Sequence, residues 1–434
     1  MVSHAGSALL AGVAAKTGLT RALSLRLGDL KTRRSGHDLG RVARDLAVML
    51  ADGGDCLADL GALGDQQALF GPVASSSTAF RVIDRIAGDP DGLQRLRAAH
   101  ARARARAWKL TGAPAELHID LDATLLSSHS DKEGAAGNFK GGFGFHPMLA
   151  YADQTGEALA AELRPGNAGA NTAIDQIAVA EQAIEQIPVE HIETIDVLLR
   201  VDSAGASHEL LDWCRDGAIR FSVGYDRDRP RRDHPDPHRA WVCATDQDGS
   251  QRPNGHVAEI THRLDLTGWP AGSRVIVRRE RAHPGAQLSF TDYDGHRFQA
   301  ILTDRPDSDI ADIERRHRAR AHVEDHIRND KDTGLRNLPF RDFEHNRVWL
   351  QLVLIAHDLI AWTQRLLLTG ETKNPTLGAR APRSLPGDEH HDHLRRPRSV
   401  RDGLNWPHQP ANTKPHRPHE PETLTSPALM HDPG

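Results

Sequence analysis

The chain has 434 residues, with 54 Lys and Arg against 59 Asp and Glu and a formal net charge of −5 at pH 7. This length suits roughly two or three domains, and the weakly acidic balance excludes a protein that binds nucleic acid through bulk positive charge alone. The three cysteines lack the spacing of a zinc site or a disulfide framework, and no segment approaches the ~18 apolar residues of a membrane span, so we expect a soluble protein of the reducing cytoplasm.

The first part of the chain predicts a helical domain, which we place at residues 1–110. An apolar stripe of helical periodicity runs through residues 40–54 and ends at two glycines. The segment SSSTAFRVIDRIAG begins with Ser and Thr residues suited to a helix N-cap. It could be the DNA-reading helix of a helix-turn-helix pair, with Arg81 and Arg85 toward DNA, or equally one more helix of a bundle.

From residue 115 the apolar period changes from that of a helix to that of a strand. In ELHIDLDATLL three apolar residues point one way, while His118, Asp120 and Asp122 point the other way. Two more strand candidates follow, FGFHPMLAY and EALAAELR, then a helix, the apolar strand IDVLLRVD, another helix and the strand IRFSVGY. This order is that of a ribonuclease-H-like α/β core, which we place at residues 115–225 and 306–368.

Residues 226–305 separate the two parts of this core and contain several short strand candidates with their own turns, so we expect an inserted β-rich subdomain. A strong helix follows from about residue 308 to 331, and then the apolar helix NRVWLQLVLIAHDLIAWTQRLLL. Residues 371–434 are rich in Pro, His and Arg without periodicity, which predicts a disordered tail. Its DEHHDH run, residues 388–393, resembles a chelating cluster, but we interpret it as adventitious.

Arginines are concentrated in three runs, at residues 101–107, 227–232 and 315–320. The planar guanidinium suits bidentate contacts with phosphate, so each run is a candidate DNA-backbone contact. Taken singly, each run is more simply explained as a solvated surface or as the arginine preference of a GC-rich genome.

Three acids are candidates for a site that binds two divalent metal ions. Hard ions such as Mg²⁺ and Mn²⁺ prefer carboxylate oxygens, and phosphoryl transfer on DNA uses such ions in pairs. Asp122 lies on the carboxylate face of the first strand, Asp202 lies at the end of the central strand, and Glu324 lies on the helix after the insertion. Asp120 is a rival for the first position because it shares a face with Asp122.

The helix that carries Glu324 also carries His317, Arg320 and Lys331. At ~100° per residue these four residues fall within an arc of about 60°. One edge of the helix is therefore expected to present a carboxylate, a guanidinium, an ammonium and an imidazole together.

Several stretches, taken together, resemble one family. They are DLAVMLADGGDCLADL, HIDLDATLLSSHSDKEGAAGNFKGGFGFHPMLAY, LLRVDSAG, and IRNDKDTGLRNLPF with FEHNRVWLQLVLIAHDLIAW. The spacing of Arg320, Glu324 and Lys331 is similar to the signature of the insertion-sequence 4 clan of DDE transposases. The flanking segments look like the insertion-sequence family numbered 1380, and the resemblance covers about residues 5–368.

This resemblance implies a ribonuclease-H-like core interrupted by a β-insertion, binding to terminal inverted repeats, and cut-and-paste transfer with Mg²⁺ or Mn²⁺. It assigns metal binding to Asp122, in an Asp-x-Thr motif with Thr124, and to Asp202 and Glu324. It implies that Arg320 and Lys331 hold DNA phosphates. His317 departs from the family, which usually has Tyr there. A homodimer on terminal-repeat and target DNA is the expected assembly.

An aromatic residue of the insertion is expected to stack on a flipped DNA base, as in related enzymes. Trp241 is the first candidate and Trp269 the second, although Trp241 could equally belong to the core of the insertion.

Two other functions stay open, namely a decayed element that binds DNA without cutting it and a stand-alone ribonuclease-H-like nuclease. The abrupt change of composition in the tail would also follow from a frameshift near residue 375.

Overall fold

The computed structural model describes residues 5–31, 36–129, 131–169, 172–225, 241–281 and 295–368. The tail that was expected to be disordered, its DEHHDH run and the arginine run at 227–232 lie outside the described residues.

The first part of the chain is helical, as predicted. It contains α1 (Ala5–Lys16), α2 (Leu19–Leu27), α3 (Leu39–Ala51), α4 (Gly61–Gly64), α5 (Gln67–Phe70), α6 (Ser76–Ala87) and α7 (Gly92–Thr111). Ser75 is the N-cap of α6, where its side chain accepts a hydrogen bond from the backbone N–H of Thr78. Helix α3 is buried over nearly its whole length, because α1, α2, α6 and α12 (Phe343–Leu367) all pack around it.

Nine strands form one mixed sheet in the order β6-β5-β1-β7-β8-β12-β11-β10-β9. Its first five strands are β1 (Glu116–Ala123), β5 (Met148–Ala152), β6 (Glu157–Glu162), β7 (Asp196–Val201) and β8 (Arg220–Gly224). Strands β1, β7 and β8 are parallel, and β5 and β6 are antiparallel to their neighbours. With α8 (Ala173–Ile184) before β7 and α9 (His208–Asp216) before β8, this is the ribonuclease-H-like α/β order that the sequence predicted.

The insertion forms strands, but they extend the core sheet instead of forming a sheet of their own. Its described strands are β9 (Val242–Thr245), β10 (Gln251–Glu259), β11 (Arg274–Arg281) and β12 (His296–Thr303). Strand β12 pairs antiparallel with β8, and β11, β10 and β9 follow in turn. Pairing to the free edge of β8 satisfies backbone hydrogen-bonding groups that would otherwise leave that edge open.

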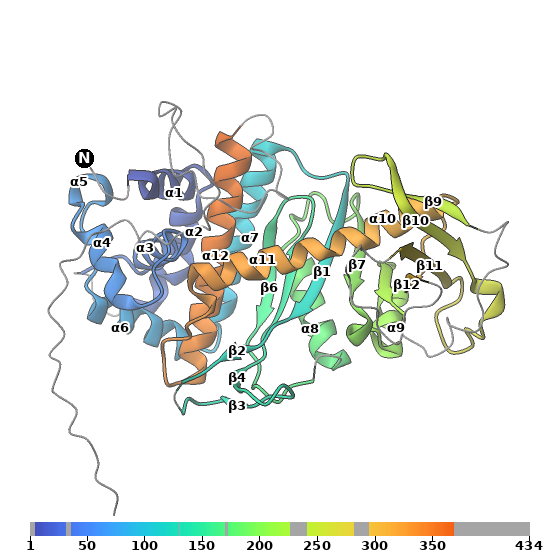
Figure 1. Ribbon diagram of the computed structural model, residues 1–434. Helices are drawn as coiled ribbons and strands as arrows, with labels where there is room; N and C mark the ends of the chain where they lie inside the picture. Colours follow the sequence, from blue (N-terminus) through green and yellow to red (C-terminus); the bar gives the residue numbers. More distant parts are fainter. Residues whose placement is uncertain are drawn as a thin grey trace, which may run out of the picture. The chain divides into compact units, whose positions relative to one another are not determined.

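The two faces of the sheet have different partners, as the alternation in β1 predicted. Leu117, Ile119 and Leu121 belong to the apolar core beneath α8 and α9. Helices α10 (Ile310–Arg318) and α11 (His322–Asp330) cross the other side of the sheet (Figure 1). Asp120 and Asp122 face that side, since Asp122 contacts Arg320 between the two helices and Arg200, the partner of Asp120, contacts Arg316 of α10.

The long helix predicted after the insertion is interrupted twice. A 3₁₀ turn, Ala319–Ala321, joins α10 to α11, and a π-helical turn, Lys331–Leu335, follows α11. Thr333 and Gly334 within the π-turn have non-helical backbone angles, with φ of 102° at Gly334. These irregularities change the direction of side chains along the helix, which matters for the candidate site.

The predicted strand FGFHPMLAY is split at His146 and Pro147. Its first part is β4 (Phe143–Phe145), which forms a small separate sheet with β2 (Leu126–Ser127) and β3 (Ala136–Gly137). Its second part is β5 of the main sheet. Among the described residues, no helix has the length and apolar character needed to cross a membrane.

Candidate active site

The carboxylate of Asp122 lies at the carboxyl end of β1, one pair from the end of its ladder with β5. The side chain is mostly buried, and its Oδ1 accepts a hydrogen bond from the backbone N–H of Ala123 at 2.9 Å. The guanidinium Nη2 of Arg320 lies 3.5 Å from the same oxygen. Both contacts are made by Oδ1 of Asp122, and they fix the direction of its carboxylate.

Asp202 directly follows β7, the strand parallel to β1 in the sheet. It is the N-cap of the turn Ser203–Gly205, and its Oδ1 accepts a hydrogen bond from the backbone N–H of Gly205 at 2.9 Å. Since parallel strands end at the same edge of a sheet, Asp202 and Asp122 come to the same edge.

Glu324 lies in the first turn of α11, which crosses β1, and its side chain is exposed. Within the part of the chain that the structure describes, neither Glu324 nor Asp202 forms an ion pair. Their negative charges are thus not neutralised by a neighbouring arginine or lysine.

Neighbouring charges shift the pKa of Asp122. Burial raises the pKa of Asp122, and the charges of Asp202 and Glu324 raise it further, while Arg320 and the hydrogen bond from Ala123 lower it. The charges of Asp202 and Glu324 therefore both act on Asp122, although the three residues come from separate elements.

Two cationic side chains contact Asp122 and Thr124. Arg320 reaches Asp122, and Lys331 Nζ donates a hydrogen bond to Thr124 Oγ1 at 2.7 Å. Burial lowers the pKa of Lys331, as do the charges of Arg336 and Lys140, whereas Asp122 raises it. The Asp-x-Thr motif is thereby joined to both cations.

His317 differs from the sequence-based expectation. Its Nδ1 lies 2.9 Å from Ser222 Oγ on β8, so the ring contacts the sheet. Burial and the charges of Arg200 and Arg320 lower the pKa of His317 to about 3. A neutral imidazole cannot bind phosphate as a cation. The 3₁₀ turn between His317 and Glu324 explains the difference, because a uniform 100° step does not hold across it.

Asp120, the rival of Asp122, has a structural partner. It is fully buried and accepts two hydrogen bonds from Arg200, from Nε and Nη2, each at 2.6 Å. Burial raises the pKa of Asp120 to about 6, although Arg200 opposes this. Arg200 also contacts Asp153 and donates to the carbonyl oxygen of Arg316 on α10. Asp120 therefore serves to join the sheet to the helix above it.

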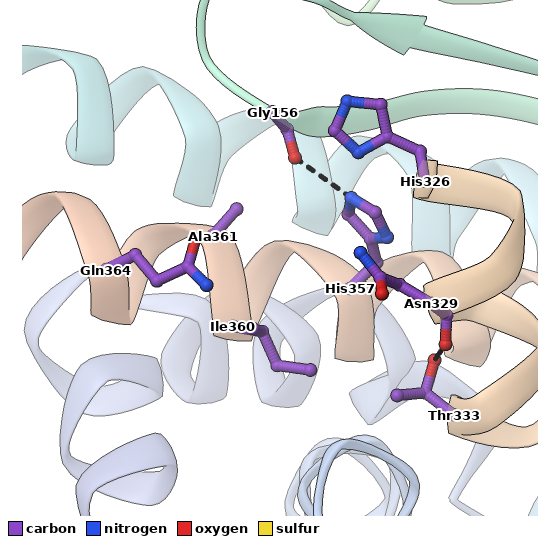
Figure 2. Close-up of a pocket in the computed structure, with 8 residues that line it drawn as sticks. All are labelled: Gly156, His326, Asn329, Thr333, His357, Ile360, Ala361 and Gln364. Carbon is purple, nitrogen blue, oxygen red and sulfur yellow. Dashed lines mark hydrogen bonds between the residues drawn. The ribbon is translucent and has the colours of Figure 1, made fainter. Parts of the chain in front are cut away.

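A second buried network, which the sequence analysis missed, lies behind α11. Tyr151 OH donates to Asp330 Oδ2 at 2.5 Å, and His357 Nδ1 contacts Asp330 Oδ1 at 2.6 Å. His357 Nε2 lies 2.9 Å from the carbonyl oxygen of Gly156 (Figure 2). The small pocket beside this network is lined by α11, the π-turn and α12, and none of the three acids lines it. The network fixes Asp330, the residue before Lys331.

The two candidate stacking residues both have partners within the fold. Trp241 lies under the guanidinium of Arg279, whose Cζ is 4.3 Å from the centre of the ring. The ring also packs against Phe298, on the face of the sheet opposite α10. Trp269 stacks on His208 of α9, with ring centres 3.9 Å apart. These contacts favour the core interpretation of Trp241.

Arg81 and Arg85 lie one helical turn apart on α6, away from its buried residues Val82, Ile83 and Ile86. Arg81 is exposed and Arg85 is half-buried. Both remain candidates for contact with DNA.

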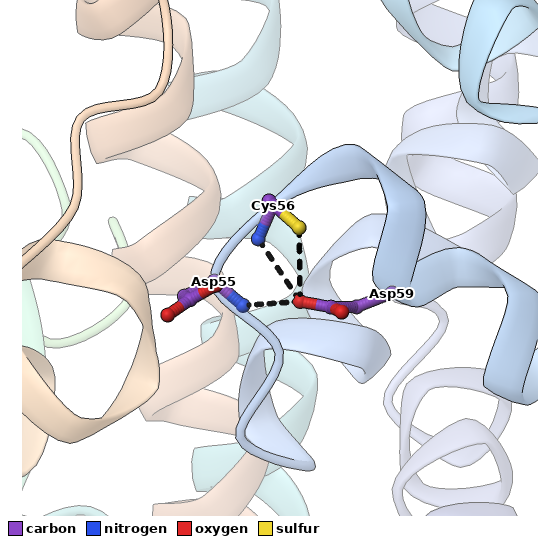
Figure 3. Close-up of side chains that lie close together, drawn as sticks. All are labelled: Asp55, Cys56 and Asp59. Atoms are coloured by element: carbon purple, nitrogen blue, oxygen red, sulfur yellow. Dashed lines mark hydrogen bonds between the residues drawn. The ribbon is translucent and has the colours of Figure 1, made fainter. Parts of the chain in front are cut away.

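One other group of metal-ligand side chains occurs among the described residues, namely Asp55, Cys56 and Asp59 (Figure 3). Asp59 Oδ2 accepts hydrogen bonds from the backbone N–H groups of Asp55 and Cys56, at 2.9 and 3.2 Å, and from Cys56 Sγ at 3.3 Å. These contacts cap the 3₁₀ turn Leu57–Leu60 and explain the cluster without a metal.

Comparison with known proteins gives a family match and likenesses to solved structures. The family model described as "Transposase DDE domain group 1" matches residues 1–377. No curated protein matches the sequence. One solved structure with a similar chain is a cryo-EM structure of the piggyBac transposase synaptic complex with hairpin DNA. It is 10% identical with a TM-score of 0.41, and the match covers 82% of this chain and 74% of that chain.

Proposed function

Because this chain belongs to the transposase DDE domain group 1 family, we propose that it cuts and rejoins DNA at the terminal inverted repeats of an insertion sequence. The family is one of polynucleotidyl transferases that act in DNA transposition. The observation that supports the proposal is that Asp122 and Asp202 lie at the ends of parallel strands, and that the charges of Asp202 and Glu324 both act on Asp122. The finer assignment to the insertion-sequence family numbered 1380 rests on the flanking motifs and stays a prediction.

DDE transposases use divalent metal ions, and the donor set fits Mg²⁺ or Mn²⁺. Asp122 and Asp202 each hold one oxygen in a backbone hydrogen bond, and Glu324 is exposed. The three acids offer hard oxygen donors with uncompensated negative charge, which suits two such ions. When bound, these ions activate the attacking oxygen and neutralise charge on the phosphate.

The chain's own residues position the DNA. Arg320 and Lys331 lie beside the acids and would bind the phosphate that is cut, because fixed positive charges stabilise the extra negative charge of the pentavalent transition state. Thr124 holds the ammonium of Lys331 in place, and Asp122 holds the guanidinium of Arg320. First, a water oxygen attacks phosphorus, the bond from phosphorus to the 3′ oxygen breaks, and that oxygen leaves as a hydroxyl. This hydroxyl then attacks the phosphorus of a second phosphodiester, whose own 3′ oxygen leaves as a hydroxyl with the transferred proton.

Recognition of the terminal repeats would involve the N-terminal helices. Arg81 and Arg85 present two charges from the outer side of α6, and phosphate contacts of this kind make affinity fall steeply with salt. A homodimer, with one copy at each end of the element, is the simplest assembly that pairs two ends.

Replacement of any one of the three acids by Ala tests the proposal. We expect Asp122→Ala, Asp202→Ala and Glu324→Ala each to abolish strand cleavage of a duplex that carries the terminal repeat, while the affinity for that duplex changes little. The repeat is read from the DNA that flanks the coding sequence, and cleavage is measured on denaturing gels with Mg²⁺ or Mn²⁺.

Asp325→Ala is the matched control, because Asp325 is the neighbour of Glu324 on α11 and forms an exposed ion pair with Arg328. It should cleave at the wild-type rate. Cleavage by Asp202→Ala at a comparable rate would refute the site. A wild-type protein that binds the repeat but never cuts it would instead support a decayed element that only binds DNA. Cleavage of any duplex without preference for the repeat would favour a stand-alone nuclease.

A further inference from the structure

The small sheet β2–β3–β4 projects from the active-site end of β1. We call residues 126–145 the wing; all of them are described except residue 130. Strand β4 pairs with both β2 and β3, and the wing begins two residues after Thr124, the partner of Lys331 (Figure 1). The wing is thus attached directly to the candidate active site.

The wing is held firmly at its base. Lys132 Nζ donates a hydrogen bond to the carbonyl oxygen of Leu338. The backbone N–H of Glu133 donates a hydrogen bond to the carbonyl oxygen of Arg341 at 2.9 Å. Glu133 Oε2 in turn accepts from the backbone N–H of Phe343 at 2.9 Å. These contacts join the wing to the segment between the π-turn and α12, so its position relative to Lys331 is fixed from two sides.

A tight turn at the tip presents an aromatic ring to solvent. Asn138 Oδ1 accepts hydrogen bonds from the backbone N–H groups of Lys140 and Gly142, each at 3.0 Å. Gly141 has a φ of 79°, which favours glycine. The side chain of Phe139 is 73% exposed, although the turn that carries it is ordered by its own hydrogen bonds.

The tip also has a positive charge. Lys140 follows Phe139, and its ammonium lies 5.6 Å from the centre of the Phe139 ring. Lys140 is near enough to the site for its charge to contribute to the lowered pKa of Lys331, after burial and Arg336. An exposed ring beside an exposed cation, whose charge acts on Lys331, is complementary to a nucleic-acid strand, in which flat bases alternate with phosphates.

We infer that Phe139 stacks on an unpaired base beside the phosphate that is cut, and that Lys140 binds a neighbouring phosphate of the same strand. This inference rests on the proposed function. It places the stacking aromatic on the wing instead of on the strands after β8. The hydrogen bonds of the turn fix the backbone that carries the ring, so little backbone entropy is lost when a base stacks on it.

The first test measures binding without cleavage. The protein carries Asp202→Ala, so that it binds a terminal-repeat duplex without cutting it. The fluorescent base 2-aminopurine is placed in turn at each position around the cleavage point. Its fluorescence is compared between this protein and one that also carries Phe139→Ala. We expect one position at which the protein unstacks the probe from its DNA neighbours, and a clear change of fluorescence there when the ring is removed. Lys140→Ala should reduce the salt dependence of binding by about one phosphate contact.

The second test measures cleavage. Phe139→Ala should slow single-end cleavage about tenfold, the effect of losing one base stack, whereas Phe139→Trp should retain most activity. Val189→Ala is the control, because Val189 is another exposed apolar residue and precedes β7, whose opposite end carries Asp202.

The outcomes separate this inference from the proposed function. If the wild type cleaves, Asp202→Ala does not, and Phe139→Ala behaves as the wild type in both tests, the inference is wrong and the proposed function stands. If the wild type does not cleave at all, the proposed function fails, and the fluorescence test alone decides about Phe139. If Phe139→Ala changes the oligomeric state but not the probe, the ring contacts a second copy of the chain, which also overturns the inference.

Discussion

At the scale of single residues, the partners of the arginines decide which of them can serve DNA. In the run at 315–320, Arg316 pairs with Glu116 and Arg318 pairs with Glu314, whereas Arg320 reaches Asp122. Arg104, from the run at 101–107, is fully buried and pairs with Asp358 at 2.6 Å. Composition identified the runs but could not distinguish these roles, because the acidic partners come from distant parts of the chain. The three candidate acids stay a prediction, which rests on their places at the ends of two strands and on the helix that follows the insertion.

Lys331 should be required for cleavage far more than for binding. Its ammonium lies at Thr124, where it can meet a phosphate bound at Asp122, and a charge contact made in the transition state is worth about 10²-fold in rate. We expect Lys331→Ala to lose about that factor in single-turnover cleavage, with a much smaller change in the affinity for the terminal repeat by gel shift.

The control for Lys331 is Arg328→Ala, an exposed cation on α11 that pairs with Asp325. It should cleave normally. Equal losses of binding and cleavage in Lys331→Ala would show that the ammonium serves general DNA attraction, contrary to the assigned role.

At the scale of secondary structure, regular periodicity predicted most elements, and departures from it account for the errors. The alternation in β1 and the caps of α6 are local properties, so the sequence was sufficient for them. The 3₁₀ turn at Ala319–Ala321 and the π-turn at Lys331–Leu335 could not be predicted in this way. Their geometry depends on tertiary contacts, such as Trp349 Nε1 donating to the carbonyl oxygen of Gly334 at 3.1 Å. The pairing of β12 with β8 likewise depends on an open sheet edge, which no local pattern shows.

The buried network behind α11 makes stability depend on pH in the alkaline range. Burial alone would lower the pKa of His357, but the charge and hydrogen bond of Asp330, with Asp358 and the Gly156 carbonyl, raise it to about 9. A folded-state pKa above the usual value means that this stabilisation is fully present below about pH 6.5 and is lost as the pH rises through 9. Its size is on the order of 3 kcal/mol. Tyr151 and His326 also face the ring of His357. Burial raises the pKa of Tyr151 and lowers that of His326 to about 3.

Urea unfolding at pH 7 and pH 9.5 should reveal this contribution. The wild type should be less stable at pH 9.5 than at pH 7. The variant His357→Gln keeps hydrogen-bonding groups but cannot carry charge, so it should be less stable than the wild type at pH 7. Its free energy of unfolding should differ much less between the two pH values. Exposed His129→Gln is the control and should behave as the wild type. An equal pH dependence in His357→Gln and the wild type would mean that His357 is neutral in the folded protein.

At the scale of the whole molecule, the N-terminal helices and the catalytic core share their interior. One apolar cluster contains residues of α1, α2, α3, α6 and α7 together with most of α12 and part of β5 and β6. Polar contacts cross the same boundary: His100 Nε2 lies 2.7 Å from Asp358 Oδ2, and Trp108 and Trp362 both donate to Glu157 at 2.6 Å. The predicted division at residue 110 therefore separates two parts of the chain that are packed as one body.

An isolated fragment of residues 1–110 is consequently expected not to fold. Without α12 it would expose the faces of α3 and α6 that now pack on that helix, and the buried charge of Arg104 would lose Asp358. A large open apolar face costs more than a small helical domain can offset. Circular dichroism should show low helicity and no cooperative melting for the fragment, whereas residues 1–368 should melt cooperatively. A fragment that melts in a single sharp transition would restore the independent DNA-binding domain. If the fragment is unfolded, the contribution of Arg81 and Arg85 to repeat recognition has to be measured in the full chain, as the salt dependence of binding by Arg81→Ala and Arg85→Ala.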